Sequence, residues 1–193
     1  MSPDLVVGRA ATFIEDKYGT IESLNSMNIN VYTQLASLMN GEQSLDNIFE
    51  DIKNVGKIFN VGDKANTLAT ELSESLKSVE DKVSTLEGEP LKVLVMTAYN
   101  DGSYNVFGAN STLQNEILEV LGGTNVNEKG GAQSLENLMS LNPDVILYVY
   151  NNKNLETDSV AVESLYNNSL IQSVPAIENK KVFEVSYTEF MGY

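Results

Sequence analysis

The chain has 193 residues, and its 12 Lys and Arg against 27 Asp and Glu give a formal charge of −15. Such acidity argues against nucleic acid as a partner, because phosphate backbones are bound by clustered cationic side chains. The absence of Cys and His excludes disulfides, thiolate zinc sites and the Ser-His and Cys-His catalytic pairs.

The N-terminal segment predicts a small piece of an α/β domain. The apolar run at residues 5–7, which Gly8 ends, is typical of a buried parallel strand. A helix is predicted over residues 20–27, and a second strand over residues 29–32. Because two strands and one helix cannot close a core, residues 1–43 are predicted to be the C-terminal part of an incomplete first α/β lobe.

Residues 44–89 predict a helical region between two lobes. Apolar residues recur every three or four positions over residues 45–59, after Ser44 as an N-cap, although Gly56 weakens this helix prediction. A second helix is predicted over residues 63–87, which at about 1.5 Å per residue would reach roughly 36 Å. A coiled coil is the alternative, but the repeat covers only about three heptads and strand signals flank it. A rigid helical spacer is therefore favoured.

Residues 90–193 predict a second α/β lobe. Strands are predicted at residues 91–96, 145–149 and 182–185, and helices at residues 111–121, 134–141 and 160–166. This alternation predicts a parallel sheet with helices on both faces. The fold class is α/β, with two parallel-sheet lobes bridged by a long interlobe helix and the first lobe incomplete. Pro3-Asp4 and Pro143-Asp144 each precede three aliphatic residues, which suggests that the two lobes are related.

Tyrosines gather close to the predicted strand ends, where ligands of parallel sheets bind. A tyrosine combines an apolar ring with a hydrogen-bonding tip, which suits a bulky and partly polar ligand. For any one tyrosine, the general preference of Tyr for strands and their rims is the simpler interpretation. The candidate ligand-binding side chains of this kind, with one neighbouring amide, are Tyr32, Tyr99, Asn100, Tyr104, Tyr150 and Tyr187.

Arg9, the only arginine of the chain, completes the candidate ligand-binding set. It follows Gly8 in a strand-to-loop turn, at the edge where sheet ligands bind. A guanidinium there can clamp a carboxylate or other anionic oxygens in a bidentate way. The alternative, weighed about equally, is a surface arginine that pairs with Glu15 or Asp16.

The sequence offers few signals for an enzyme. It lacks the dinucleotide-binding, phosphate-loop and nucleophile-elbow motifs. Neighbouring carboxylates such as Glu50 and Asp51 are interpreted as solvated charges, because they would point apart on a helix. A hydrolase or transferase that uses Asp101 or Glu189 with a metal is the alternative, although their spacing does not demand a metal. We therefore expect no enzyme, no catalytic residue and no metal site or cofactor held by the protein itself.

Several segments resemble the substrate-binding proteins of ABC importers, in the group that serves iron–siderophores, cobalamin and haem. The resemblance implies two α/β lobes bridged by one long helix, with a small-molecule metal chelate between them and an ABC permease dimer as partner. It implies an iron–siderophore as ligand, with cobalamin or haem as the alternative, and the metal arrives already chelated. The segments that carry the resemblance are residues 3–8, 44–61, 122–126, 133–147 and 179–185.

Glu136, in Ser134-Leu135-Glu136, matches an exposed glutamate with which this family docks onto arginines of the permease. The alternative is a carboxylate in the first turn of a helix, which the helix dipole favours.

The chain departs from the family at both ends. Members have further strands and helices before Pro3-Asp4, a signal peptide, often a lipid-anchored cysteine, and a closing helix beyond Tyr193. Residues 1–4 do not resemble a signal peptide, and no run approaches the ~18 apolar residues of a membrane span. We therefore expect a truncated form of an extracytoplasmic protein whose signal and anchor are absent from this chain.

Two expectations follow from the incomplete first lobe. Its exposed sheet edge is expected to favour a homodimer or exchange between chains. A structural or interaction fragment that binds no ligand is the further alternative to a capture protein.

Overall fold

The structure is a computed structural model, and it describes residues 3–38, 43–100, 102–106, 111–127, 129–151 and 155–191. The chain divides into two compact units, residues 1–78 and 79–193. This boundary falls inside the long predicted helix, and the three-part division into residues 1–43, 44–89 and 90–193 stays a prediction. Among the described residues, no helix is both long enough and apolar enough to cross a bilayer.

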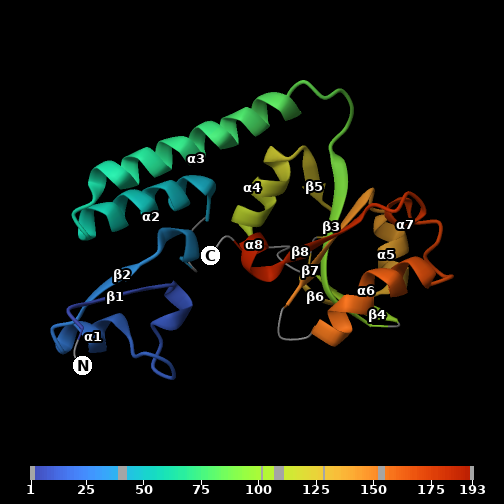
Figure 1. The fold of residues 1–193 in the computed structure, drawn as a ribbon. Coiled ribbons are helices and arrows are strands. Elements are labelled where there is room, and N and C mark those ends of the chain that lie inside the picture. The colour runs from blue at the N-terminus through green and yellow to red at the C-terminus, as the bar shows by residue number, and fades with distance from the viewer. Residues whose placement is uncertain are drawn as a thin grey trace. The chain divides into compact units, whose positions relative to one another are not determined.

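The N-terminal half of the first unit is a two-stranded parallel sheet with one helix (Figure 1). Strands β1 (Leu5–Gly8) and β2 (Asn30–Thr33) confirm the two predicted strands, and α1 (Ile21–Ser26) confirms the helix between them. The 3₁₀ helices η1 (Ala10–Thr12) and η2 (Leu35–Ser37), which follow the strands, were not predicted. The buried apolar side chains described in this half are Phe13, Leu24 and Ile29.

Two long helices follow, and they confirm the two helices predicted between residues 44 and 89. Helix α2 (Leu45–Ile58) begins at the predicted cap, since the Ser44 hydroxyl accepts a hydrogen bond from the Asn47 amide. Helix α3 (Gly62–Val83) runs uninterrupted across the unit boundary. Helix α2 continues through Gly56, where a Cβ atom would lie 2.2 Å from the Cβ of Ala65 on α3. The glycine therefore permits the close approach of α2 and α3 that the sequence pattern could not reveal.

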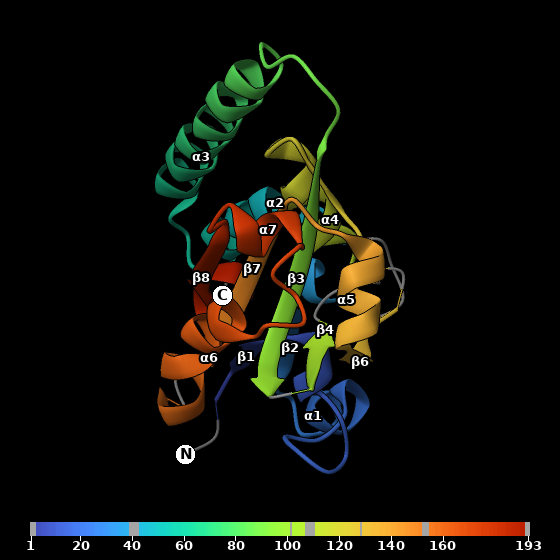
Figure 2. The same cartoon turned by 90° about the vertical axis from the view of Figure 1, so that its right-hand side faces the viewer.

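The second unit is built on a mostly parallel sheet with the order β6-β4-β3-β7-β8, in which β5 also pairs with β3 (Figure 2). The three predicted strands are confirmed as β3 (Leu91–Asn100), β7 (Val145–Tyr150) and β8 (Val182–Ser186). They are parallel to one another, as predicted. The unpredicted strands are β4 (Ser103–Val106) and β6 (Gly131–Ser134), which are antiparallel, and β5 (Gly123–Asn125), which is parallel to β3.

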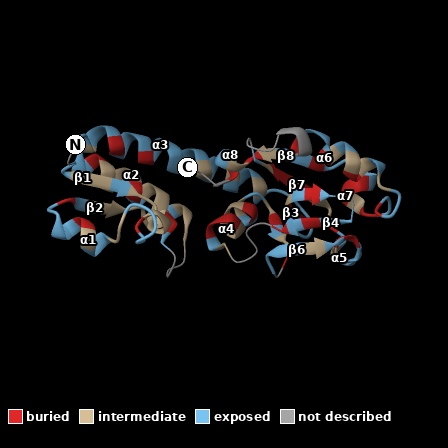
Figure 3. Ribbon diagram, turned by 90° about the horizontal axis from the view of Figure 1, so that it is seen from below, coloured by how far each residue is buried: buried red, intermediate tan, exposed pale blue. Residues whose placement is uncertain are grey.

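Helices cover both faces of this sheet, which confirms the α/β fold class. On one face, Leu138, Leu165 and Ile177 bring α5 (Leu135–Leu141), α6 (Leu155–Asn167) and α7 (Pro175–Glu178) into the larger core cluster. On the other face, Leu118 of α4 (Thr112–Val120) and Phe190 of α8 (Tyr187–Met191) pack into a smaller cluster. Figure 3 shows the buried residues concentrated in β3, β7 and the helices beside them. Helices α4, α5 and α6 were predicted, whereas the short α7 and α8 were not.

Candidate functional site

The carboxyl ends of β1 and β2 form one edge of the first unit, because the two strands are parallel and in register. Arg9 follows β1 directly and is half-buried at the start of η1, in the strand-to-loop turn that the sequence predicts. Hydrogen bonds tie the two loops together, since the Ala10 amide donates to the Ser37 hydroxyl at 2.9 Å and the Gln34 amide to the Gly8 carbonyl at 3.0 Å. We call this the first edge, and it consists of residues 9–12 and 34–37.

The first edge is anchored by a carboxylate that the sequence analysis misjudged. Asp51 was interpreted as a solvated charge, but it is only 9% exposed on α2. Its side chain accepts hydrogen bonds from the Tyr32 hydroxyl at 2.6 Å and from the Leu35 and Ala36 amides at 2.8 and 3.0 Å. Burial, followed by the hydrogen bond to Asp51, raises the pKa of Tyr32 to about 12. The hydroxyl of Tyr32 is therefore bonded to the carboxylate that holds this loop, and its predicted contact with a ligand stays a prediction.

The carboxyl ends of β3, β7 and β8 form the corresponding edge of the second unit. Tyr150 ends β7 and lies opposite Ser186 in the register with β8, and Asn100 ends β3 as an exposed residue. Tyr150 packs on the face with the larger core cluster, whereas Tyr187 packs on the opposite face. The structure thus brings three predicted residues to one edge, each from a different element. We call this the second edge, and it consists of residues 100, 150–151 and 186–187.

Two other predicted tyrosines lie in the core instead of at a rim. The prediction that β3 ends at Met96 is wrong, because the strand continues to Asn100 through an irregularity at which Ala98 has a positive φ of 47°. Tyr99 is therefore a strand residue that is 7% exposed, and its hydroxyl accepts a hydrogen bond from the Asn168 amide group at 2.9 Å.

Tyr104 lies within β4, not in a loop after a strand, and is 1% exposed. Its hydroxyl has no partner in hydrogen-bond geometry among the described residues. Burial raises the pKa of Tyr104 to about 12, and the Asn137 side chain offsets only part of the rise. Such burial favours a packing role for Tyr104 over the predicted contact with a ligand.

The second edge also has a buried carboxylate that the sequence analysis did not select. Asp158 on α6 is 7% exposed and accepts hydrogen bonds from the Tyr148 hydroxyl at 2.8 Å and the Asn151 amide at 2.7 Å. Burial and this carboxylate raise the pKa of Tyr148 above its usual value.

One sequence signal could have found both aspartates. Asp51 lies three residues after Ile48 and four before Val55, on the apolar face of its helix, and Asp158 lies three residues before the buried Ala161. A carboxylate on a core-facing position requires hydrogen-bonding partners.

The metal-dependent alternative has no support among the described residues. Glu189 belongs to a capping box at the start of α8, because its amide donates to the Ser186 hydroxyl oxygen at 3.2 Å and its carboxylate accepts from the Ser186 amide at 3.3 Å. Asp101 lies outside the described residues. No group of three or more Asp and Glu in the described part of the chain is arranged to hold a metal ion.

Glu136 is exposed in the first turn of α5, as predicted. A hydrogen bond with the Ser134 side chain, and then one with its own backbone, lowers the pKa of Glu136. The side chain therefore presents a negative charge to solvent at neutral pH. Its predicted role in docking stays a prediction.

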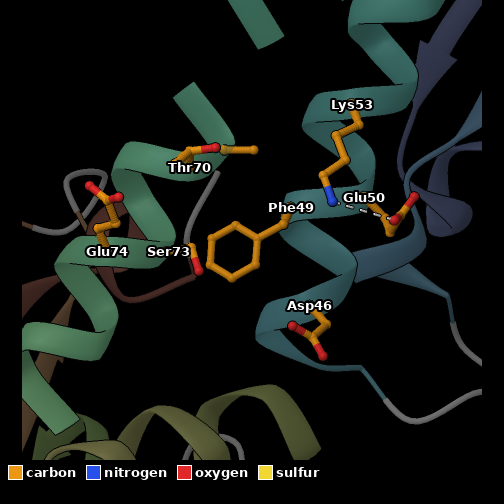
Figure 4. Close-up of a pocket in the computed structure, with 8 residues that line it drawn as sticks. Asp46, Phe49, Glu50, Lys53, Thr70, Ser73 and Glu74 are labelled. Atoms are coloured by element: carbon orange, nitrogen blue, oxygen red, sulfur yellow. Dashed lines mark ion pairs between the residues drawn. The ribbon is translucent and has the colours of Figure 1, made fainter. Parts of the chain in front are cut away.

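A groove of about 510 Å³ lies between α2 and α3 within the first unit (Figure 4). The ring of Phe49 points into it, and Lys53 pairs with Glu50 at 3.7 Å beside it. Three carboxylates and one ammonium line the groove, so its charge does not suit an anionic ligand. None of the predicted site residues is among its lining residues, which are Asp46, Phe49, Glu50, Lys53, Ala69, Thr70, Ser73 and Glu74.

Residues 1–187 match the periplasmic binding protein family. An uncharacterised ABC transporter substrate-binding lipoprotein of Bacillus subtilis, YvrC, is 23% identical over 188 residues, which are 96% of this chain and 55% of that protein. The high-affinity heme uptake system protein IsdE of Staphylococcus aureus is 26% identical over 151 residues, which are 76% of this chain and 51% of that protein. The chain therefore spans about half the length of these relatives.

Solved structures share the fold. A periplasmic binding protein from Veillonella parvula superposes with a TM-score of 0.81 at 24% identity, over 97% of this chain and 58% of that one. An ABC-type Fe³⁺-hydroxamate transport protein from Saccharomonospora viridis gives a TM-score of 0.67 at 22% identity, over 96% of this chain and 62% of that one. At these identities the likeness extends to the fold alone.

Proposed function

Because the chain belongs to the periplasmic binding protein family, whose members bind solutes for transport and are not enzymes, we propose that it acts as a substrate-binding component of an ABC importer. The observation that carries the proposal is the pair of edges, one in each unit, in which loops at the carboxyl ends of parallel strands are held by hydrogen bonds. Ligands of parallel sheets bind beyond such ends. The first and second edges are proposed to contact the same ligand.

A ferric siderophore is the proposed ligand. Arg9 supplies a cation at the first edge of a chain with a charge of −15, and Tyr150 and Tyr187 supply partly apolar surface at the second. These groups suit an anionic chelate, and a relative in structure is a transport protein for Fe³⁺-hydroxamate. The metal enters within its chelate, so the protein needs no metal ligand of its own.

Haem is the second candidate, supported by the 26% identity with a heme uptake protein. Because the chain has no histidine, it would hold haem without an imidazole ligand. Cobalamin, which the sequence resemblance also implies, is the third candidate ligand.

Titration of the intrinsic tyrosine fluorescence tests the proposal, since the chain has nine tyrosines and no tryptophan. We expect saturable quenching by a ferric hydroxamate siderophore, and an Arg9→Gln variant that binds it about tenfold more weakly, because a charge-assisted hydrogen bond contributes about 1.5–3 kcal/mol. Lys64→Gln, which removes an exposed cation from α3, is the matched control and should bind as the wild type does. Saturable quenching by haemin or cobalamin, without a response to the siderophore, would contradict the ferric siderophore as ligand and identify haem or cobalamin instead. No response to any of the three by a folded sample would favour a structural fragment.

The proposed permease contact is Glu136. Its exposed and negatively charged side chain is suited to dock onto cationic residues of an ABC permease dimer. We expect Glu136→Gln to leave ligand affinity unchanged and to reduce stimulation of the transporter ATPase in liposomes. Equal stimulation by the variant and the wild type would exclude this contact. The role places the protein outside the cytoplasm, which protease accessibility in intact cells would test.

A second copy of the chain is also a proposed partner. Each strand of the β1–β2 sheet pairs on one side only among the described residues, which leaves backbone groups open to another strand. Light scattering during size exclusion should then report a dimer, and a monomer at all concentrations would contradict pairing or exchange.

A further inference from the structure

The two buried aspartates have two hydrogen bonds of the same kind in the two units, and Asp51 accepts a third from the Ala36 amide. In the first unit, Asp51 accepts from the hydroxyl of Tyr32 and from the amide of Leu35, three residues further along the chain. In the second unit, Asp158 accepts from the hydroxyl of Tyr148 and from the amide of Asn151, again three residues further along. Each carboxylate therefore links a strand residue to the backbone that leaves the same strand.

The carboxylate comes in both cases from the next α-helix of the chain. Asp51 lies on α2, which follows β2, and Asp158 lies on α6, which follows β7. The separations in sequence differ, since Asp51 comes 19 positions after Tyr32 and Asp158 comes 10 positions after Tyr148. Neither the separation nor the position relative to Pro3-Asp4 and Pro143-Asp144 is shared. The two arrangements are therefore alike in geometry and not in sequence.

Both carboxylates are almost fully buried, which makes their partners energetically important. Asp51 is 9% and Asp158 7% exposed. A buried carboxylate is tolerated only when hydrogen bonds replace its lost hydration. A buried donor that loses its acceptor costs more free energy than a typical hydrogen bond contributes to stability. The backbone amides at positions 35, 36 and 151 are thus held in place, because the buried carboxylates need them as hydrogen-bond donors.

The amides that are held belong to the two proposed ligand-binding edges. Leu35 and Ala36 are part of the first edge, and Asn151 is part of the second edge, directly after Tyr150. Fixing these loops before a ligand arrives lowers the ordering cost of binding.

We propose that Asp51 and Asp158 are positioning residues that fix the loops of the first and second edges for the ligand. The inference rests on the proposed function for its ligand, whereas the fixing of the loops can be measured without one. Asparagine is the informative substitution, because it keeps the shape of Asp but offers one acceptor oxygen and one NH₂ group. One of the present donors would then face another donor.

Amide hydrogen exchange followed by NMR on the full chain tests the fixing of the loops. Asp51→Asn should raise the exchange rates of the Leu35 and Ala36 amides about tenfold or more, and Asp158→Asn should do the same for Asn151. Tyr32→Phe and Tyr148→Phe remove only the hydroxyl donor and should leave these amides protected. If an Asp variant does not fold, exchange in the wild type still tests the proposal, because Leu35, Ala36 and Asn151 amides that exchange as fast as unprotected amides would show that the carboxylates do not hold them. The controls are Glu50→Gln on α2 and Glu163→Gln on α6, which are exposed carboxylates of the same helices.

Two outcomes would overturn the proposal. Exchange at these amides that stays within twofold of the wild type in the Asp variants would show that the carboxylates do not fix the loops. A uniform rise across the whole unit would show a general role in stability. With a ferric hydroxamate siderophore or haemin as the probe, each Asp variant should also bind about tenfold more weakly, mainly through slower association. A wild type that binds neither probe would overturn the proposed function, while the exchange data would still decide whether the loops are fixed.

Discussion

Single side chains near the strand ends bond to buried carboxylates that hold the backbone. The hydroxyl of Tyr32 is committed to Asp51, and that of Tyr148 to Asp158. Arg9 lies in the turn directly after β1, as predicted from its place after an apolar run and a glycine. Residue type could place Arg9 and Tyr150 at strand ends, but it could not separate them from tyrosines that pack in the core or bond to a buried carboxylate. Contact of any of them with a ligand stays a prediction.

Tyr104 gives the sharpest test at this scale. Its pKa of about 12 in the folded chain exceeds the usual value of 10.0, so between pH 10 and 12 the unfolded chain releases a proton that the folded chain retains. The contribution of Tyr104 to stability should be constant below pH 10 and become less favourable as the pH rises to 12. Tyr104→Phe should reduce this fall in urea-unfolding measurements, and should change the free energy of unfolding at pH 7 by less than about 1 kcal/mol.

The same variant also tests the packing role. Because the Tyr104 ring is 1% exposed, loss of its hydroxyl should leave ligand affinity unchanged. A clear loss of affinity, with normal stability, would show that Tyr104 reaches the ligand after all.

Elements with a strong hydrophobic period could be predicted from the sequence, and short polar ones could not. In the amphipathic α2 and the apolar β7, many residues fit one hydrophobic pattern, so each element is predicted by several residues at once. Strand β6, with the sequence Gly-Ala-Gln-Ser, has no such pattern, and it exists because the backbone of β4 offers it hydrogen bonds. The continuation of β3 beyond Met96 depends on its antiparallel pairing with β4, which explains why Tyr99 was assigned to a loop.

Gly56 tests the packing of α2 on α3. Gly56→Ala should improve helix propensity by about 1 kcal/mol, yet the new Cβ would meet the Ala65 Cβ, and overpacking of this kind costs about 1–3 kcal/mol. We therefore expect a net loss of stability, measured as a lower urea midpoint by circular dichroism. Gly62→Ala is the matched control, because nothing lies within 4 Å of its Cβ, and it should not destabilise.

A compensating variant separates crowding from other effects. In Gly56→Ala combined with Ala65→Gly, the space is restored, so the loss should be smaller than the sum of the two single losses. Strict additivity would contradict the close contact.

At the scale of the whole molecule, the chain consists of two units that share one continuous helix. The sequence predicted the α/β class and the uninterrupted α3 because both depend on periodicity along the chain. The partners of Asp51 and Asp158 depend on contacts between distant residues, and those were out of reach of pattern analysis. We propose that one metal chelate engages both edges at once.

Hydrogen exchange of the full chain with and without a saturating ferric hydroxamate siderophore tests this claim most directly, with haemin as the second probe. We expect protection at residues 9–12 and 34–37 of the first edge and at residues 100, 150–151 and 186–187 of the second edge, with the same dependence on ligand concentration. Residues 69–74, which line the groove between α2 and α3, should be unchanged. Protection confined to one unit, or to that groove, would contradict it.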